Sequence, residues 1–201
     1  MTREVLTLSA EHLWLVLLPV VIAVALAVPS AVAATRNASL RRWLIAFANV
    51  VQTVPSLALF GFLLPIPLIG GIGKRTAVVA LVLYALLPVL RNTAVGILGV
   101  DAAVRESAVA MGMTSRQVLW QVEFPLAIPS LLAGIRIATV STVGAATIAA
   151  AIGGGGLGVF IFRGIAMVDT RTVLAGAIPA ALMALLADWG LGWIERKLSP
   201  A

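Results

Sequence analysis

Residues 105–125 read RESAVAMGMTSRQVLWQVEFP, a polar stretch in a chain otherwise dominated by long apolar runs. It carries charged and amide side chains, a glycine near its middle and a proline at its end. Connections in helical bundles usually have about 2–8 residues, and longer ones are more often functional. An ordinary connecting loop is the simpler alternative, but the length and polarity favour a structured segment with a task of its own.

Capping signals divide residues 101–125 into two predicted short helices. Asp101 can N-cap a helix that starts at Ala102, and Gly112 stands where a left-handed glycine ends a helix. Thr114-Ser115-Arg116-Gln117 has the pattern of a capping box, so it opens a second helix. Pro125 marks the predicted end of that helix. The first helix offers a small apolar face that suits docking of a partner: Ala103, Val104, Ala108 and Met111.

The rest of the chain has the composition of a polytopic membrane protein. Of its 201 residues, 61% are hydrophobic and 11% are charged, whereas soluble domains carry about 25% charged residues. The predicted fold class is all-α, with residues 1–201 forming a single membrane domain. Five apolar segments are long enough to cross a bilayer as helices. They lie at about 12–34, 43–64, 76–99, 127–151 and 172–194.

The first apolar segment is predicted to be a retained helix. Ala31-Val32-Ala33 resembles a signal-peptide cleavage site, but the apolar run before it is longer than the about 7–15 residues of a signal peptide. With the N-terminus outside, seven basic residues fall on inner segments and five on outer ones. The inner set is Arg36, Arg41, Arg42, Arg105, Arg116, Arg196 and Lys197; the outer set is Arg3, Lys74, Arg75, Arg163 and Arg171. The bias is modest, and it predicts a cytoplasmic 101–125 segment and C-terminus.

Several function classes are excluded by what the chain contains. It has no cysteine, which rules out disulfides and thiolate metal sites. The net charge of +6 comes from scattered clusters rather than an aromatic-interleaved patch, so we expect no nucleic-acid binding. No Ser-His-Asp set, carboxylate pair or metal cluster is visible, and we therefore expect no enzymatic activity, cofactor or metal site in this chain.

The spacing within the 101–125 segment resembles the EAA loop of ABC importer permeases. Glu106-Ser107-Ala108 is followed by Gly112, Val122 and Pro125 at the positions of that pattern, with Ser107 and Phe124 as mild departures. The resemblance implies a coupling helix that sits in a groove of a cytoplasmic ATPase. The implied coupling residues are Glu106, Ser107, Ala108, Gly112, Met113, Thr114, Val122 and Pro125.

A wider resemblance covers about residues 10–195. Segments 52–59, 90–93, 153–158 and 161–165 are similar to permeases of the glycine betaine/carnitine/choline (osmoprotectant) uptake family. The resemblance implies a type I, methionine-permease-like importer fold in a prokaryotic plasma membrane. It also implies a second permease chain, identical or paralogous, an external substrate-binding protein and separate ATPase subunits that hold ATP and Mg. A permease for another small solute such as methionine, and a stand-alone secondary transporter, are the alternatives.

Polar side chains also mark a candidate translocation path. Asn49, Gln52, Thr53 and Ser56 recur at i, i+3, i+4 and i+7, which is one face of a helix. Polar residues within a span normally face protein or water. This face therefore either lines the path or holds the bundle together by interhelical hydrogen bonds.

The remaining candidate sites have structural interpretations. Residues 70–76 imitate a phosphate loop but lack its first glycine and the Ser or Thr after the lysine, so they are predicted to form a turn. The glycine-rich run 153–158 is expected to allow close backbone approach. His12 is predicted to be a structural residue at the interface. The lone tyrosine, Tyr84, gives no aromatic cage for a quaternary ammonium. Asp188 is expected to pair with Arg136 or Arg91.

Overall fold

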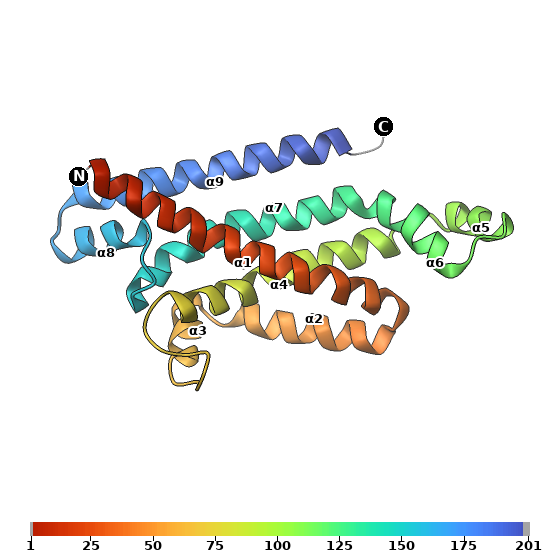
Figure 1. The fold of residues 1–201 in the computed structure, drawn as a ribbon, viewed down its shortest axis with the longest axis horizontal. Coiled ribbons are helices and arrows are strands. Elements are labelled where there is room, and N and C mark those ends of the chain that lie inside the picture. Colours follow the sequence, from red (N-terminus) through yellow and green to blue (C-terminus); the bar gives the residue numbers. More distant parts are fainter. Residues whose placement is uncertain (1, 199–201) are drawn as a thin grey trace.

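The computed structural model describes residues 2–198, and all regular elements within that range are helices. Four long helices run side by side along the molecule (Figure 1): α1 (Thr2–Arg36), α4 (Lys74–Leu98), α7 (Phe124–Ile148) and α9 (Thr170–Leu198). Helix α4 packs against both α1 and α7, while α9 packs on α7 and on the short α8 (Gly158–Ala166). The all-α prediction is confirmed.

The predicted spans match these helices, although the helices extend beyond the apolar runs. The first begins at Thr2 rather than near residue 12, and the fourth belongs to a continuous helix over Ser115–Ile152. Four helices within the described range are long and apolar enough to cross a membrane, and a fifth span is obtained if one bent pair is counted together. Polar ends lengthen these helices because their backbone hydrogen bonds continue past the hydrocarbon region.

The second predicted span is not a single helix. It consists of α2 (Ala38–Thr53) and α3 (Ser56–Leu63), which are bent by 103° relative to each other. The residue before a proline is driven out of the helical conformation, and Val54 is accordingly extended ahead of Pro55. The Tyr84 hydroxyl on α4 donates to the Val54 carbonyl and so satisfies a backbone group at the break. Prolines inside α1, α4, α7 and α9 leave those helices continuous.

Small residues allow the central helices to pack closely. A row of small residues on α7 is buried, with at most 1% of each residue exposed: Ala138, Thr142 and Ala146. A Cβ on Gly134 would lie 2.8 Å from the Pro88 carbonyl oxygen of α4. The core is therefore built from close backbone approach, as is usual between helices in a membrane.

The glycine-rich run closes one end of the bundle. It follows a 3₁₀ turn, η2 (Ala149–Ile152), and leads into α8. A Cβ on Gly158 would lie 1.9 Å from the Thr147 carbonyl oxygen, which only glycine avoids. The Gly156 N–H donates to Glu11 at 3.3 Å, and Glu11 pairs with Lys74 at 3.0 Å. Close approach is confirmed here. The turn predicted over 70–76 lies at the same end (Figure 1), but it spans residues 64–73, and residues 74–76 already belong to α4.

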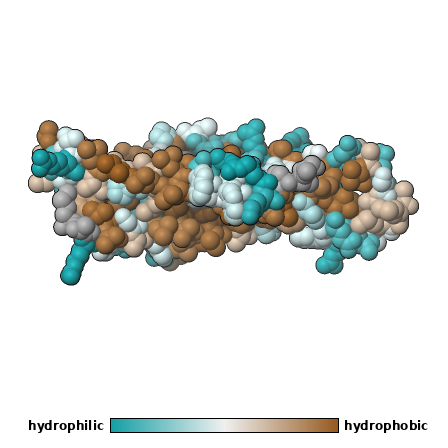
Figure 2. Space-filling view, turned by 90° about the horizontal axis from the view of Figure 1, so that it is seen from above, coloured by the Kyte–Doolittle hydropathy of each residue, from teal (hydrophilic) through white to brown (hydrophobic). Residues whose placement is uncertain are grey.

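The connections divide cleanly between the two ends of the molecule. The α1–α2 turn, α5 (Ala102–Ala110), α6 (Ser115–Gln117) and the C-terminal end of α9 lie at one end (Figure 1). The start of α1, the α3–α4 turn and α8 lie at the other. Apolar side chains cover much of the face seen in Figure 2, with polar side chains at both ends and in one group between them. This arrangement fits a multi-pass membrane protein.

Candidate coupling site

The first helix of the 101–125 segment is capped as predicted at both ends. The Asp101 carboxylate accepts the Ala103 N–H at 2.8 Å, which fixes the start of α5. At the other end Gly112 has a φ of +82°. Its N–H donates to the Val109 carbonyl at 2.9 Å, and the Met113 N–H donates to the Ala108 carbonyl at 3.2 Å. These two bonds form a Schellman motif, and they make α5 a short rod with a defined end.

The second predicted helix begins as expected but does not end at Pro125. Thr114 and Gln117 form the predicted capping box. Beyond α6 a π-helical turn, η1 (Val118–Glu123), leads directly into α7. Pro125 occupies the first turn of α7, where proline is tolerated, so it continues the helix rather than stopping it. The segment therefore contains one free-standing short helix, α5, and the N-terminal extension of a long apolar helix.

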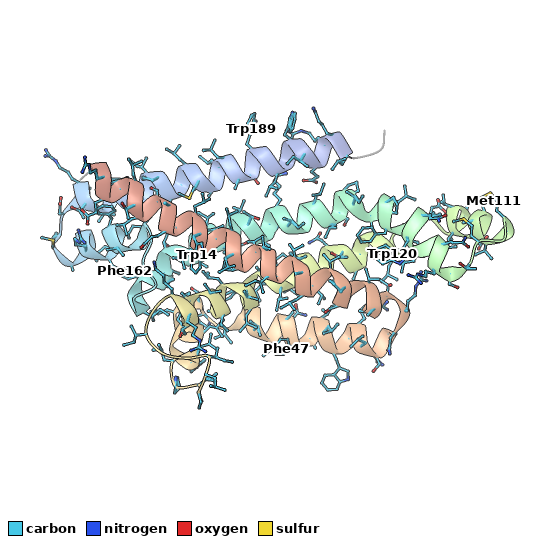
Figure 3. All side chains as sticks on the ribbon, viewed as in Figure 1. Trp14, Phe47, Met111, Trp120, Phe162 and Trp189 are labelled. Carbon is cyan, nitrogen blue, oxygen red and sulfur yellow. The ribbon has the colours of Figure 1, made fainter. Side chains whose placement is uncertain are left out.

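Several apolar side chains on this projection face outward. Met111 is 76% exposed and lies at the far tip of the molecule, and Trp120 is 51% exposed on the adjoining helix (Figure 3). Val104 and Val109 are also exposed, at 43% and 59%. Pairs of large apolar side chains on a polar projection mark an interaction surface.

A shallow open groove lies beside Trp120 on the same projection. Its volume is about 360 Å³, and four of its five lining residues are of polar type: Thr114, Arg116, Gln117 and Gln121, with Trp120 as the fifth. Glu106 on α5 is exposed and makes no hydrogen bond or ion pair with any residue of the described range. A carboxylate left free beside exposed apolar side chains is suited to contact a protein partner.

The predicted coupling residues occupy three kinds of position. Glu106, Ser107, Gly112 and Thr114 are exposed, as a contact surface requires. Ala108 is only 2% exposed and packs inward, so it helps to hold α5 against the rest of the chain. Met113 and Val122 are half-buried, and Pro125 is exposed at the start of α7. The motif thus contributes both contacts for a partner and contacts that hold the helix in place.

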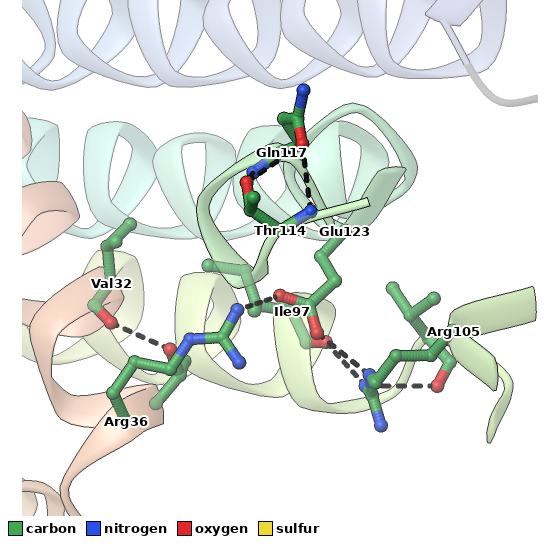
Figure 4. A network of polar contacts seen from close by, with 9 residues as sticks. Val32, Arg36, Ile97, Arg105, Thr114, Gln117 and Glu123 are labelled. Atoms are coloured by element: carbon green, nitrogen blue, oxygen red, sulfur yellow. Dashed lines mark hydrogen bonds and ion pairs between the residues drawn. The ribbon is translucent and has the colours of Figure 1, made fainter. Parts of the chain in front are cut away.

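Glu123 is the residue of this region that sequence reasoning missed. Its side chain is 3% exposed, and it accepts from Arg36 at 2.6 Å and from Arg105 at 2.8 Å (Figure 4). Arg105 also reaches the Val100 carbonyl at 3.3 Å, near the end of α4. No local pattern in the sequence indicates this role, because Arg36 and Arg105 lie 87 and 18 positions away along the chain.

The candidate path residues do not share one helical face. Asn49, Gln52 and Thr53 are exposed on α2, whereas Ser56 begins α3 beyond the 103° bend. The periodicity prediction assumed a continuous helix and is wrong for Ser56, because Pro55 breaks the helix. The Thr53 hydroxyl donates within its own helix, to the Val50 carbonyl at 2.8 Å.

Two further predictions about polar residues in the bundle have a clear outcome. Arg136 on α7 donates two hydrogen bonds of 2.6 and 2.7 Å to Asp188 on α9. Of the two predicted partners, Asp188 therefore pairs with Arg136 and not with Arg91. His12 is fully buried rather than interfacial, because α1 begins ten residues earlier than the apolar run. Its Nε2 lies 3.2 Å from the Val143 carbonyl oxygen, which is a structural contact between α1 and α7.

Comparisons with known proteins agree with this architecture. The family model for the binding-protein-dependent transport system inner membrane component matches residues 13–200. The chain is 44% identical over 197 residues to the glycine betaine/carnitine/choline transport system permease protein OpuCB of Bacillus subtilis, covering 98% of this chain and 89% of that one. It is 49% identical over 182 residues to the carnitine transport permease protein OpuCD of Listeria monocytogenes, covering 90% of this chain and 80% of that one.

A solved structure shares the fold. The methionine ABC transporter MetNI in an inward-facing conformation has a chain that matches with a TM-score of 0.83 at 23% identity, covering 94% of both chains. At that identity the likeness concerns the fold, which is that of a type I ABC importer permease. Taken with the family match across nearly the whole chain, these similarities lead to one conclusion: the chain belongs to the family of binding-protein-dependent transport system inner membrane components.

Proposed function

We propose that this chain is the membrane permease subunit of an ABC importer for osmoprotectants such as glycine betaine, choline and carnitine. The observation that carries the proposal is the capped, outward-facing α5 on a chain that is 41–49% identical to permeases named for these solutes. The chain provides the path and the docking element. ATP hydrolysis belongs to a separate ATPase subunit, which would hold ATP and Mg.

The geometry of α5 supports the assignment of an ATPase partner. A coupling element has to be stiff, because a flexible loop would absorb the motion of the partner. Helix α5 is fixed at its start by Asp101 and at its end by the Gly112 turn. The free Glu106 and the exposed Met111 then give the partner both a charge and an apolar contact. A second permease chain, identical or paralogous, and an external binding protein complete the proposed assembly.

The proposed orientation places α5 in the cytoplasm and the N-terminus outside. Basic residues at the α5 end include Arg36, Arg41, Arg42, Arg105 and Arg116, in the direction that the positive-inside rule requires. The C-terminal end of α9, with Arg196 and Lys197, lies at the same end of the molecule (Figure 1). The opposite end, with α8 and the α3–α4 turn, would then lie on the outer side of the membrane.

The exposed polar face of α2 is the proposed contribution to the translocation path. Asn49, Gln52 and Thr53 lie on it, and Ser56 follows at the start of α3. A path that holds substrate weakly also releases it readily, so selection of the substrate would rest mainly on the binding protein. Interhelical hydrogen bonding with a second permease chain is the alternative role for these side chains.

Methionine is the alternative substrate. It is favoured only by the fold match at 23% identity, whereas the relatives above 40% identity carry osmoprotectant names. Uptake by proteoliposomes that contain the full permease, its ATPase and its binding protein decides between them. We expect accumulation of labelled glycine betaine, choline or carnitine that unlabelled methionine does not reduce. Accumulation of methionine alone would overturn the substrate assignment.

A further inference from the structure

We propose that Glu123 is a positioning residue that fastens the coupling helix α5 to the transmembrane bundle. This inference rests on the proposed function, since it assigns to Glu123 the step that passes movement from α5 into the membrane helices. Glu123 stands outside the residues predicted for docking, and its side chain points away from the outer surface of the projection, at 3% exposure.

Helix α5 has few other attachments to the rest of the chain. Ala108 is its one buried residue, and its main neighbour in the described range is η1. The remaining side chains of α5 face solvent or are half-buried. The Arg105–Glu123 ion pair, at 2.8 Å, is therefore the principal side-chain tether between α5 and the helix that becomes α7.

The same carboxylate reaches α1. Its second oxygen pairs with Arg36, the last residue of α1, at 2.6 Å (Figure 4). Arg105 adds a contact of 3.3 Å to the Val100 carbonyl, just after α4. Glu123 thus joins α5 to α1 and to the start of α7, and Arg105 adds the contact to the end of α4.

The backbone and the apolar residues around Glu123 make this junction firm. The Phe124 N–H donates to the Leu119 carbonyl five residues earlier, which is the wider π-helical turn. Leu119, Ile97 and Ala127 form a small buried cluster from the same helices, with Val32 of α1 packed against it. The buried Glu123 carboxylate has defined geometry beside this cluster, because each of its oxygens accepts from its own arginine.

Removal of the carboxylate is compatible with a folded bundle. The side chains of Arg36 and Arg105 are 48% and 34% exposed, so both guanidinium groups reach water when the carboxylate is lost. Glu123→Gln keeps the size of the side chain and removes both ion pairs. Arg105→Gln removes the ion pair between α5 and Glu123, together with the Arg105 bonds to the Ile97 and Val100 carbonyls, and leaves the Arg36 pair in place. Glu4→Gln is the matched control, because it removes a 2.9 Å ion pair to Arg163 at the opposite end of the molecule.

The first test is the number of substrate molecules taken up per ATP hydrolysed by the complete transporter in proteoliposomes. For equal amounts of assembled complex, we expect Glu123→Gln and Arg105→Gln to lower this ratio about fivefold or more, the lower range of couplings between distant sites. The double variant should fall by less than the product of the two single losses, because both changes break the Arg105–Glu123 ion pair. Glu4→Gln should keep the wild-type ratio. An unchanged ratio in Glu123→Gln, or losses that multiply in the double variant, would overturn the proposal.

The second test does not depend on transport. The chain has no cysteine, so spin labels can be placed on Ala110→Cys in α5 and Ser39→Cys in α2, both at exposed positions. We expect a narrow distance distribution between the labels, broadened by Glu123→Gln and left unchanged by Glu4→Gln. If the distribution responds but no partner ATPase supports uptake, the proposed function fails while the tether stands. An identical distribution in Glu123→Gln would refute the tether itself.

Discussion

At the scale of the residue, a few single side chains and glycines support the fold. Gly112 adopts a φ of +82° and Tyr84 holds the Val54 carbonyl, and neither role requires contact with a substrate. The first could be predicted from the sequence, because a glycine between two capping signals is typical of a helix end. The second could not, since the partner of Tyr84 lies 30 positions away and becomes free only at the helix break.

Gly112→Ala is expected to loosen the end of α5. No atom lies within 4 Å of an added Cβ, so the cost is backbone strain alone, about 1–2 kcal/mol for a left-handed residue. Hydrogen exchange of the amides of residues 108–113 should become faster, and Gly112→Asn should have a smaller effect because asparagine tolerates this conformation. Gly190→Ala, also without neighbours within 4 Å but in an ordinary helical conformation, is the control. Equal exchange in Gly112→Ala and wild type would contradict the turn assignment.

Tyr84→Phe tests the bend between α2 and α3. The change leaves the Val54 carbonyl without its donor at the helix break, and an unsatisfied buried group costs about 1–3 kcal/mol. We expect a lower midpoint of thermal unfolding in detergent. Trp189→Phe, which alters a side chain that is 68% exposed on α9, should leave the midpoint unchanged. A Tyr84→Phe protein with the wild-type midpoint would show that the hydroxyl does not support the bend.

At the scale of the element, the sequence predicts where apolar helices lie but not where they bend. The long apolar runs correspond to α1, α4, α7 and α9, because length and composition decide a span. Pro55 and Pro125 show the limit of this reasoning. Pro55 breaks a predicted span, whereas Pro125 continues a helix that it was expected to end. The surroundings of the two prolines differ. A π-helical turn precedes Pro125 and lets the helix continue, whereas the Tyr84 hydroxyl binds the carbonyl that is left free at the break before Pro55.

The clamp between α7 and α9 gives a prediction at this scale. Arg136 and Asp188 pair through two bonds, and Gly192 lets the guanidinium lie against α9, where a Cβ would come within 2.9 Å of Nη1. We expect Arg136→Gln and Asp188→Asn each to lower the unfolding midpoint in detergent. The double variant should lose less than the sum of the two, because the partners share one interaction. Additive losses would show that the pair does not join the helices.

At the scale of the whole molecule, the two ends have different tasks in the proposed importer. Met111 at the tip of the α5 projection is 76% exposed, and Val168 between α8 and α9 is 93% exposed. With the proposed orientation, a membrane-impermeant maleimide should label Val168→Cys in intact spheroplasts and Met111→Cys only after permeabilisation. The absence of native cysteine makes each label specific. Labelling of Met111→Cys alone in intact spheroplasts would reverse the assigned topology.

The fold and the docking segment could thus be predicted from the sequence to different depths. Hydropathy and capping signals are local, so they indicate the helices, the start of α5 and the turn at Gly112. Glu123 and the α2–α3 bend depend on partners far away in the chain, at Arg36 and Tyr84, and local patterns do not contain them. The substrate is even harder to predict from this sequence, since selection of the substrate is proposed to rest on a separate binding protein.

The central claim is that a partner ATPase drives this permease through α5. The most direct measurement is ATP turnover of the complete transporter in proteoliposomes, with and without the substrate-loaded binding protein. We predict that loaded binding protein stimulates turnover in the wild type, and that Glu106→Ala removes this stimulation while the ATPase stays assembled, because Glu106 is exposed on α5 without a partner in the described range. Full stimulation in the Glu106→Ala and Gly112→Ala proteins would contradict the claim.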